Sequence, residues 1–453
     1  MESPKCLIVG SGLMVRSLIS TLFPLGYNIT VTGNVQSELD SLSGEFNITT
    51  VFADACQEGA LNPLVQGMTV VISMIPPRFH HRVLQACIAS KVNLVTPSYV
   101  SQDMYSLEQE AKDAGIVVSN ENGLDPGIDH MSVIKKLEEI RSKGGKVEEF
   151  QSSCGAFPAP EACTNKLCYK LAWAPYGALL AATRPAKYLK SNEIVEISGC
   201  ELMGAQKPYD IAFPLPITFY PNGDSLVYPK KYGIEEAHTV MRCTLRYKNY
   251  PIICQALCVL GIYNESPRKF TENYTWVELL EELAGLEEKA SDNLPEFFTE
   301  TLSRKLIAKF QYLPQENLRL IFEAFHELGL SSNAPVVGNS VFAAYVNQVQ
   351  GLLEYKEGER DCVIMEHLFK VRYEDKVVRH KSRLIDYGVP NGGTSAVSRL
   401  VSVPTALAAD WVCKNNHAPG FMFPMESKFA SDVLRKLEEE YNVKFEEEEE
   451  VIG

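Results

Sequence analysis

The first 125 residues alternate short apolar runs with segments of helical spacing. The apolar and β-branched runs predict six strands, at Lys5–Val9, Asn28–Thr32, Thr49–Phe52, Thr69–Ile75, Val92–Val95 and Ile116–Ser119. Apolar residues three or four positions apart predict helices at Leu13–Leu25, Phe79–Ser90 and Ser106–Ala114. Strands that alternate with helices in this way are typical of an α/β fold with a Rossmann-type, doubly wound parallel sheet.

The pattern changes after Gly123. Strand-like segments such as Glu149–Ser152 and Met241–Tyr247 lie among aromatic residues and prolines, and they predict a second α/β domain with a mixed sheet. Helical spacing then dominates residues 273–330, in segments 276–290, 297–310 and 317–330, which predicts a helical subdomain. Strand-like residues resume at Asp361–Tyr373, and Thr394–Ala408 is helical again. The glutamate-rich end, Val443–Val451, predicts a solvated or frayed tail.

Composition narrows the class of protein. A net charge of −14 over 453 residues argues against nucleic acid and against anionic membrane as partners, because both would repel such a field. The chain has no run of 18 apolar residues, no separate hydrophobic leader and no peroxisomal tripeptide, so we expect a cytoplasmic protein. Its 12 cysteines form no CxxC motif, and we expect no metal site.

A glycine turn, Gly10-Ser11-Gly12-Leu13-Met14, lies between the first predicted strand and the first predicted helix. Gly10 permits a tight turn, and Gly12 lacks the Cβ that would keep a pyrophosphate from the backbone. The helix N-terminus would add N–H donors. Val15 occupies the usual third glycine or alanine position and weakens the fingerprint. We expect residues 10–14 to bind a dinucleotide.

Two further loops bear on the cofactor. The second strand ends in Gly33-Asn34-Val35, with neither the acid that holds the ribose of NAD nor the base that holds the phosphate of NADP. The residues alone therefore leave the cofactor choice open. After the fourth strand, Ile75 and Pro76 are predicted to line the cofactor crevice. Arg78 or His80 could also contact the cofactor, or could belong to a solvated helix N-terminus.

Several motifs together resemble one family, the glutamate-forming saccharopine dehydrogenases. They are TPSYVS (Thr96–Ser101), NENGLDPGIDH (Asn120–His130), CGAFPAPE (Cys154–Glu161), YKLAW (Tyr169–Trp173), RCTLRY (Arg242–Tyr247), EGERD (Glu357–Asp361) and YGVP (Tyr387–Pro390). The resemblance implies an NADP-dependent oxidoreductase of lysine metabolism. The family reaction oxidises the secondary amine of saccharopine, and water splits the imine into glutamate and 2-aminoadipate 6-semialdehyde.

The resemblance also implies a division into domains. We expect a dinucleotide-binding domain over residues 1–125, to which the segment 394–445 returns. Residues 126–265 and 335–393 would form a substrate and dimerisation domain, and residues 266–334 the helical subdomain. A homodimer is a possible assembly, and the expected ligand is a dicarboxylic or tricarboxylic amino acid.

Four positions match family residues at the substrate. Ser98 and Tyr99 can donate hydroxyl hydrogens to a carboxylate, although they could instead form a polar strand-end turn. Asp125 suits a general acid–base or an ammonium partner, but an aspartate before a helix is often an N-cap. Cys154 matches a cleft cysteine that the resemblance places among the catalytic residues, and a buried thiol is the alternative.

Arg242, Thr244 and Arg246 alternate along a predicted strand and therefore share one face. Paired guanidiniums on that face suit a substrate with two carboxylates, and a surface ladder of salt bridges is the alternative. His130 is more simply a packed structural histidine.

Three positions depart from the family. Asn34, Tyr176 and Lys231 stand where arginine is usual, the first at the cofactor phosphate and the others at the substrate. The leading hypothesis is therefore an NADP-dependent saccharopine dehydrogenase, with NAD as a possible cofactor. An enzyme for another opine-like amine and a non-catalytic nucleotide-binding protein are the alternatives.

Overall fold

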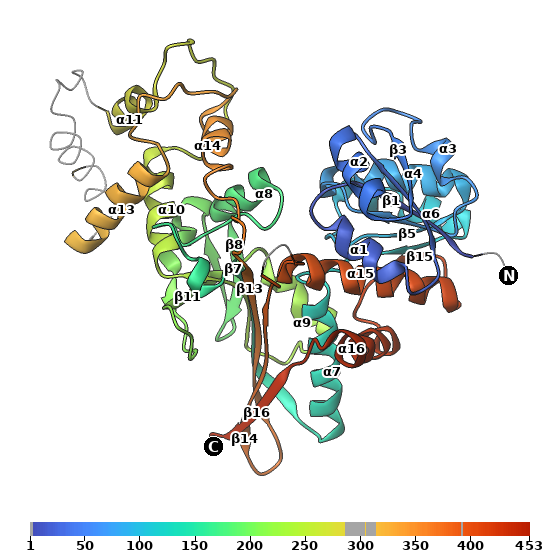
Figure 1. Ribbon diagram of the computed structural model, residues 1–453. Helices are drawn as coiled ribbons and strands as arrows, with labels where there is room; N and C mark the ends of the chain where they lie inside the picture. Colours follow the sequence, from blue (N-terminus) through green and yellow to red (C-terminus); the bar gives the residue numbers. More distant parts are fainter. Residues whose placement is uncertain (1–2, 286–303, 305–313, 391–392) are drawn as a thin grey trace.

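The computed structural model describes residues 3–285, 304, 314–390 and 393–453, which form two lobes, each built around one sheet (Figure 1). The predicted helical segment 297–310 lies outside these residues except for Arg304, as does the end of segment 276–290.

The first lobe contains a parallel seven-stranded sheet in the order β15-β6-β5-β4-β1-β2-β3. Its strands are β1 (Lys5–Val9), β2 (Asn28–Gly33), β3 (Thr49–Phe52), β4 (Val70–Ser73), β5 (Asn93–Val95), β6 (Val117–Ser119) and β15 (Gly420–Met422). The predicted doubly wound sheet is confirmed. The last strand, β15, comes from the C-terminal part of the chain and pairs with β6.

Helices cover both faces of this sheet. They are α1 (Val15–Leu22), α2 (Gln36–Glu45), α3 (Asn62–Val65), η1 (Pro77–Phe79), α4 (His80–Ser90), α5 (Gln102–Tyr105), α6 (Glu108–Ala114) and the long α15 (Ala396–Lys414). Leu7 packs with α4 on one face, whereas Ile8 packs with α1 and α15 on the other, as the alternation of a strand requires. Helix α15 runs beneath the sheet toward the second lobe (Figure 1).

The second lobe contains a mixed sheet in the order β10-β11-β12-β7-β13-β14-β16, with β8 and β9 branching from β12. Its strands are β7 (Lys146–Pro158), β8 (Ala186–Lys190), β9 (Glu193–Ile197), β10 (Lys207–Pro208), β11 (Ile217–Pro221), β12 (Thr239–Tyr247), β13 (Asp361–Arg372), β14 (Val377–Tyr387) and β16 (Glu446–Val451). The pair β7–β12 is parallel and its neighbours are antiparallel, so the predicted mixed sheet is confirmed.

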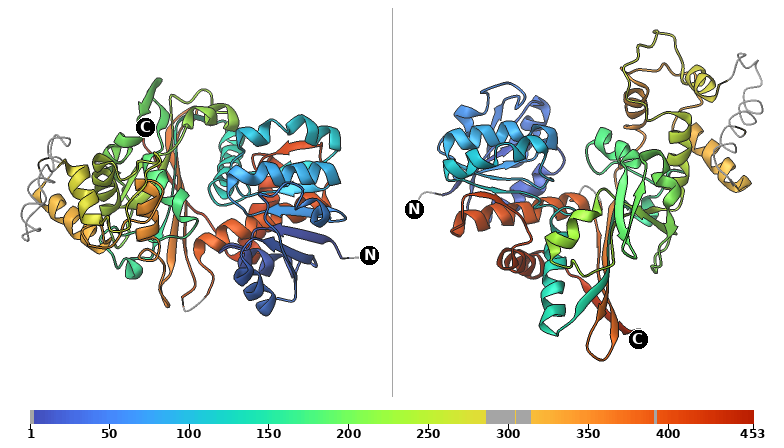
Figure 2. Two further views of the ribbon diagram at one scale, coloured as in Figure 1. Left: turned by 90° about the horizontal axis from the view of Figure 1, so that it is seen from above. Right: turned by 180° about the vertical axis from the view of Figure 1, so that it is seen from behind.

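The helices of this lobe fall into two groups. Helices α8 (Pro175–Leu180), α10 (Asn249–Leu260), α11 (Trp276–Ala284), α13 (Gln315–Glu327) and α14 (Val341–Val349) share one apolar core at the far end of the sheet. Helices α7 (Ile128–Ser142), α9 (Tyr228–Tyr232) and α16 (Ser427–Tyr441) lie beside the first lobe (Figure 2). Short 3-10 turns complete the lobe at η2 (Pro160–Ala162), η3 (Ala181–Thr183), η4 (Gly199–Ala205) and η5 (Ser225–Val227). Within the described ranges, no helix has the length and apolar character needed to cross a membrane.

The glutamate-rich end is exposed to solvent along Glu446–Val451, as one alternative predicted, but the other alternative, a frayed tail, is wrong. Residues Glu446–Val451 form β16, which pairs antiparallel with β14. Cations on the neighbouring elements offset the row of glutamates: Arg379 contacts Glu450 at 2.7 Å and Lys136 contacts Glu447 at 2.7 Å. Cross-strand pairs of opposite charge stabilise such an edge strand. The limits of the domains stay a prediction.

Candidate active site

A cavity of about 320 Å³ opens at the carboxyl ends of the first strands of the parallel sheet. Six residues predicted to contact the cofactor line it: Gly10, Ser11, Gly12, Asn34, Ile75 and Pro76. Two other predicted residues do not: Leu13 is 68% exposed on the turn, and Met14 packs against the core. Contact of any of these residues with a cofactor stays a prediction.

The glycine turn has the geometry that a pyrophosphate requires. Gly10 has a φ of +117°, and a Cβ there would lie 3.1 Å from the carbonyl carbon of Met74. A Cβ on Gly12 would meet no atom within 4 Å, so the backbone of Gly12 borders open space. Helix α1 begins at Val15, directly after the turn, which brings its free N–H groups to the cavity. These residues fit a dinucleotide.

The rim of the cavity beyond β2 carries two acids that were not predicted. Glu38, in the first turn of α2, accepts a hydrogen bond from Ser11 Oγ at 2.5 Å. Asp54 follows β3 and accepts from the Cys56 N–H at 2.9 Å. Neither lysine nor arginine is among the described residues that line the cavity. A ribose-binding acid is expected at the end of β2. Glu38 comes after that strand, in α2, and was therefore not among the predicted residues.

After β4, Ile75 and Pro76 line the cavity, but His80 does not. His80 is buried, and its ring bonds Ser73 Oγ at 2.7 Å and Thr96 Oγ1 at 3.0 Å. Burial lowers the pKa of His80 to about 4, so the ring is neutral and joins β4 to the end of β5. His80 is therefore neither part of the cavity lining nor a solvated helix end. Arg78 is exposed, and its guanidinium lies 4.7 Å from the ring centroid of Phe79.

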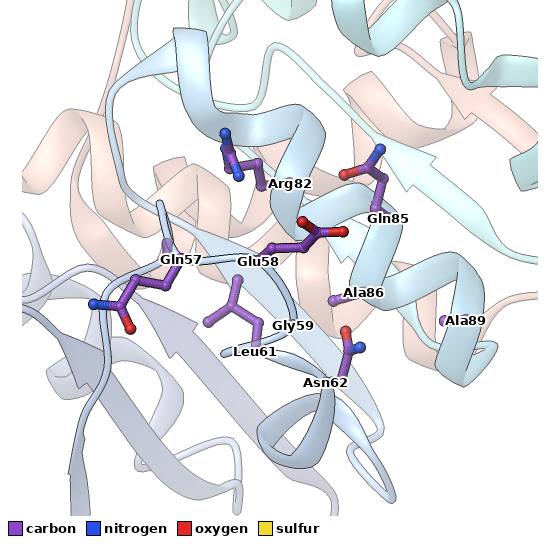
Figure 3. Close-up of a pocket in the computed structure, with 10 residues that line it drawn as sticks. Gln57, Glu58, Gly59, Leu61, Asn62, Arg82, Gln85, Ala86 and Ala89 are labelled. Atoms are coloured by element: carbon purple, nitrogen blue, oxygen red, sulfur yellow. The ribbon is translucent and has the colours of Figure 1, made fainter.

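A second cavity of about 300 Å³ lies between α4 and the loop after β3 (Figure 3). Arg82, Gln57 and Glu58 line this cavity, and Ala55 borders both cavities. The Nε of Arg82 is buried without a hydrogen-bond partner in the structure. Because Arg82 lines only the second cavity, it stands outside the lining of the dinucleotide cavity.

A tight turn after β6 places Asp125. Gly127 has a φ of +145°, and a Cβ there would lie 2.0 Å from the carbonyl oxygen of Gly123, so only glycine fits. The N–H of Gly127, the residue before α7, donates to Asp129 Oδ1 at 2.6 Å. The N-cap alternative for Asp125 is therefore wrong, and its carboxylate is left to face the second lobe.

Arg242 on β12 gathers the polar groups at this turn. Its guanidinium, on a residue only 4% exposed, pairs with Asp125 and, at 2.6 Å, with Asp129. It also donates to the hydroxyls of Tyr99, at 2.8 Å, and of Tyr228. The Tyr99 hydroxyl in turn donates to Asp125 at 3.0 Å. The surface-ladder alternative is wrong for Arg242, because Arg242 itself is buried.

A third carboxylate stands behind this cluster. Glu121 lies 3.1 Å from His130 Nε2 and 3.7 Å from Lys231 Nζ, and His130 Nδ1 shares a 2.6 Å hydrogen bond with the Tyr232 hydroxyl. Burial alone would raise the pKa of Glu121, but His130, Lys231 and Arg242 together hold it below its usual value. His130 is fully buried in this network, as expected of a packed histidine.

Arg246 lies two residues beyond Thr244 on the same strand, yet its surroundings are the opposite of those of Arg242. The residue is 8% exposed; among the described residues its Nε has no hydrogen-bond partner, and its Nη1 donates to the Leu245 carbonyl at 2.8 Å. No carboxylate of the described residues pairs with it. Its guanidinium lies 5.3 Å from the Tyr169 ring and 5.5 Å from the Tyr250 ring. A buried cation of this kind is suited to bind an incoming anion.

Cys154 on β7 lies beside Thr244 in the parallel register. Burial, and then the charges of Asp125 and Asp129, raise the pKa of the Cys154 thiol well above its usual value. The thiol is therefore protonated near neutral pH and can only donate a weak hydrogen bond. A catalytic part for Cys154 stays a prediction, but a thiolate nucleophile does not fit this site.

The other predicted substrate residues lie at different distances from the cluster. Ser98 precedes Tyr99, and its carbonyl accepts from the Glu121 N–H at 3.1 Å. Tyr176 lies in the first turn of α8; its hydroxyl donates to Glu265 at 2.5 Å, and its ring centroid lies 4.8 Å from that of Phe342. Contact of these residues with a substrate stays a prediction.

Two family models match consecutive parts of the chain. Residues 6–118 match the saccharopine dehydrogenase NADP binding domain, and residues 123–443 match the saccharopine dehydrogenase C-terminal domain. Saccharopine dehydrogenase (NADP+, L-glutamate-forming) of Pyricularia oryzae is 34% identical over 455 residues, covering 99% of both chains. Mitochondrial alpha-aminoadipic semialdehyde synthase of Bos taurus is 33% identical over 447 residues, which are 96% of this chain and 47% of that protein.

A solved structure agrees with these relatives. Apo saccharopine dehydrogenase (L-Glu forming) from Saccharomyces cerevisiae is similar with a TM-score of 0.87 and 31% identity, over 99% of this chain and all of that one. Such relatives do not favour the two alternatives, an enzyme for another amine or a non-catalytic protein. The chain is an oxidoreductase with an NADP-binding domain, and it belongs to the saccharopine dehydrogenase family.

Proposed function

We propose that this chain oxidises saccharopine with NADP in lysine metabolism. Of the two carbons bonded to the secondary amine, the one that becomes the aldehyde carbon loses a hydride, which the nicotinamide accepts when the cofactor is bound. The resulting imine takes up water, and the carbon–nitrogen bond breaks to give L-glutamate and 2-aminoadipate 6-semialdehyde. The comparisons support the family, and the side chains around β12 support the substrate class.

The observation that carries the proposal is the contrast between two arginines on one strand face. Arg242 is saturated by Asp125 and Asp129, whereas Arg246 is buried with no carboxylate partner among the described residues. A substrate carboxylate would provide the missing partner by two parallel hydrogen bonds. Thr244, between the two arginines, offers a further hydroxyl to the same ligand.

The acid cluster suits the amine end of the substrate. Glu121, Asp125 and Asp129 are three carboxylates in contact with Arg242, Lys231 and the imidazole of His130, and a protonated amine is the ligand group that such carboxylates would bind. Asp125 is the accessible member, because its side chain is 16% exposed, compared with 1% for Asp129 and 3% for Glu121. We assign Asp125 to hold the protonated amine and to exchange its proton, with Tyr99 fixing the carboxylate.

Initial rates of NADP reduction with saccharopine test this function. The Asp125→Asn variant should lose at least about 100-fold in kcat, the typical contribution of a positioned acid–base group. Arg379→Gln is the matched control, because Arg379 pairs with Glu450 at the far edge of the sheet and should leave the rate unchanged. Equal rates for wild type and Asp125→Asn would contradict the assignment of Asp125.

Other features of the proposal need separate measurements. A homodimer would be seen as twice the chain mass in light scattering, and a cytoplasmic location by imaging of the tagged full-length protein.

If Tyr176 binds substrate as predicted, Tyr176→Phe should raise KM and leave cofactor binding unchanged. A KM equal to that of the wild type would remove Tyr176 from the site.

A further inference from the structure

The ribose end of the dinucleotide cavity has an unusual charge for an NADP-binding domain. In Rossmann folds the adenosine ribose lies beside the end of β2, where a base holds the 2′-phosphate of NADP or an acid holds the 2′-hydroxyl of NAD. Here Asn34 directly follows that strand, and the only charged residues of the described lining are Glu38 and Asp54. Both are acids, so nothing in the lining neutralises a 2′-phosphate.

A hydrogen bond to the glycine turn fixes the position of the Glu38 carboxylate. Glu38 belongs to the first turn of α2, and its Oε2 accepts the 2.5 Å hydrogen bond from Ser11 in the glycine turn. Glu38 is thereby fixed between the pyrophosphate turn and the end of β2. Its other carboxylate oxygen, Oε1, has no recorded hydrogen bond to the described residues, and is available to a ribose hydroxyl.

We propose that Glu38 takes over the part of the ribose-binding acid and makes this chain bind NADH at least as tightly as NADPH. The proposal rests on the proposed function, in which a nicotinamide dinucleotide binds in this cavity. It adds that Glu38 sets the preference between NADH and NADPH. The carboxylate accepts from the 2′-hydroxyl of NADH, whereas it repels the 2′-phosphate of NADPH.

Arg78 and Arg82, whose charges reach the cavity wall, do not replace the missing base in the structure. The charges of Arg78 and Arg82 reach Cys56 on the cavity wall, but neither residue lines the cavity. Arg78 stacks on Phe79, and Arg82 lines the second cavity (Figure 3). Arg82 is the stronger competitor, because its Nε is buried without a partner.

Fluorescence titration of the full-length protein with NADH and with NADPH, without any amine, tests the proposal. For the wild type, the ratio of Kd for NADPH to Kd for NADH should be one or greater. Glu38→Gln should lower that ratio about tenfold, a change equivalent to about 1.4 kcal/mol. Glu58→Gln is the matched control, because this acid lines only the second cavity, and it should leave the ratio unchanged.

Four results would overturn the proposal. They are a wild-type ratio below one, the same shift in Glu38→Gln and Glu58→Gln, no shift in Glu38→Gln, and a tenfold loss of NADPH affinity in Arg82→Gln. If Glu38→Gln does not fold, the wild-type ratio and competition by ADP against 2′-phospho-ADP decide the question. Binding of neither dinucleotide would overturn the dinucleotide site itself, whereas NADPH preference would overturn only the part assigned to Glu38.

Discussion

Replacing the two arginines of β12 with methionine should change the free energy of unfolding by very different amounts. In Arg242→Met, Asp125 and Asp129 lose their cation, and a broken buried ion pair costs about 3–5 kcal/mol of unfolding free energy. In Arg246→Met, no carboxylate is left unpaired, and only contacts with Tyr169 and Tyr250 are lost. The desolvation of a lone buried charge is relieved at the same time, so we expect a change within about 1 kcal/mol.

The same two variants should differ from each other in the balance of stability and activity. Loss of a bidentate carboxylate contact at Arg246 removes two charge-assisted hydrogen bonds, each about 1.5–3 kcal/mol, and should lower kcat/KM for saccharopine at least about 100-fold. Urea unfolding of the free protein gives the stability, and initial rates give kcat/KM. Arg246→Met should thus be stable and inactive, whereas Arg242→Met should be unstable.

Two results would refute this reasoning. If Arg246→Met is destabilised as strongly as Arg242→Met, Arg246 has a structural partner and is not waiting for an anion. If Arg246→Met keeps the kcat/KM of the wild type, the substrate carboxylate binds elsewhere.

Three further predictions concern the framework of the site. Burial lowers the pKa of His80 from its usual 6.5 to about 4, so as the pH falls the unfolded chain takes up a proton at this residue before the folded protein does. Between pH 7 and pH 5 the free energy of unfolding of the wild type, measured in urea, should fall by about 2 kcal/mol more than that of His80→Asn. Equal losses in the two proteins would contradict the burial effect. Gly127→Ala should lower the free energy of unfolding by about 3 kcal/mol or more, because the added Cβ would meet the Gly123 carbonyl. Gly144 also has a positive φ but borders open space, so Gly144→Ala should lower it by only about 1 kcal/mol in the same thermal melts. Similar losses in the two variants would argue against the steric explanation. Lys136→Met should speed hydrogen exchange of the β16 amides through loss of the Glu447 contact, and unchanged exchange would mean that backbone pairing alone holds that strand.

The parallel sheet could be predicted because its strands are local apolar runs. Each predicted strand of the first lobe overlaps an observed one, and the helix after β1 begins only two residues later than expected. Helix α2 was missed because it buries only two leucines, Leu39 and Leu42, which give a weak helical pattern. Most of β7 was missed as well, because its interior run Ser152–Gly155 is polar or small and becomes buried only between β12 and β13.

Partners that meet across the fold could not be predicted. The resemblance named Tyr99, Asp125 and Arg242, but the second carboxylate, Asp129, lies 113 positions from Arg242 in the chain, and nothing local indicates the contact. The lack of a partner at Arg246 is also a property of the folded protein alone. The glutamates of β16 gave a tail-like pattern because their cations are on β14 and α7.

The central claim is that this site cleaves saccharopine by oxidation at the amine. The most direct test is to incubate the purified full-length protein with saccharopine and NADP, and to measure L-glutamate and NADPH in the same sample. We expect the two products in equal amounts, and both to form at least about 100-fold more slowly in Arg246→Met under the same conditions. NADPH without glutamate, or no turnover by a folded protein that binds the dinucleotide, would contradict the claim.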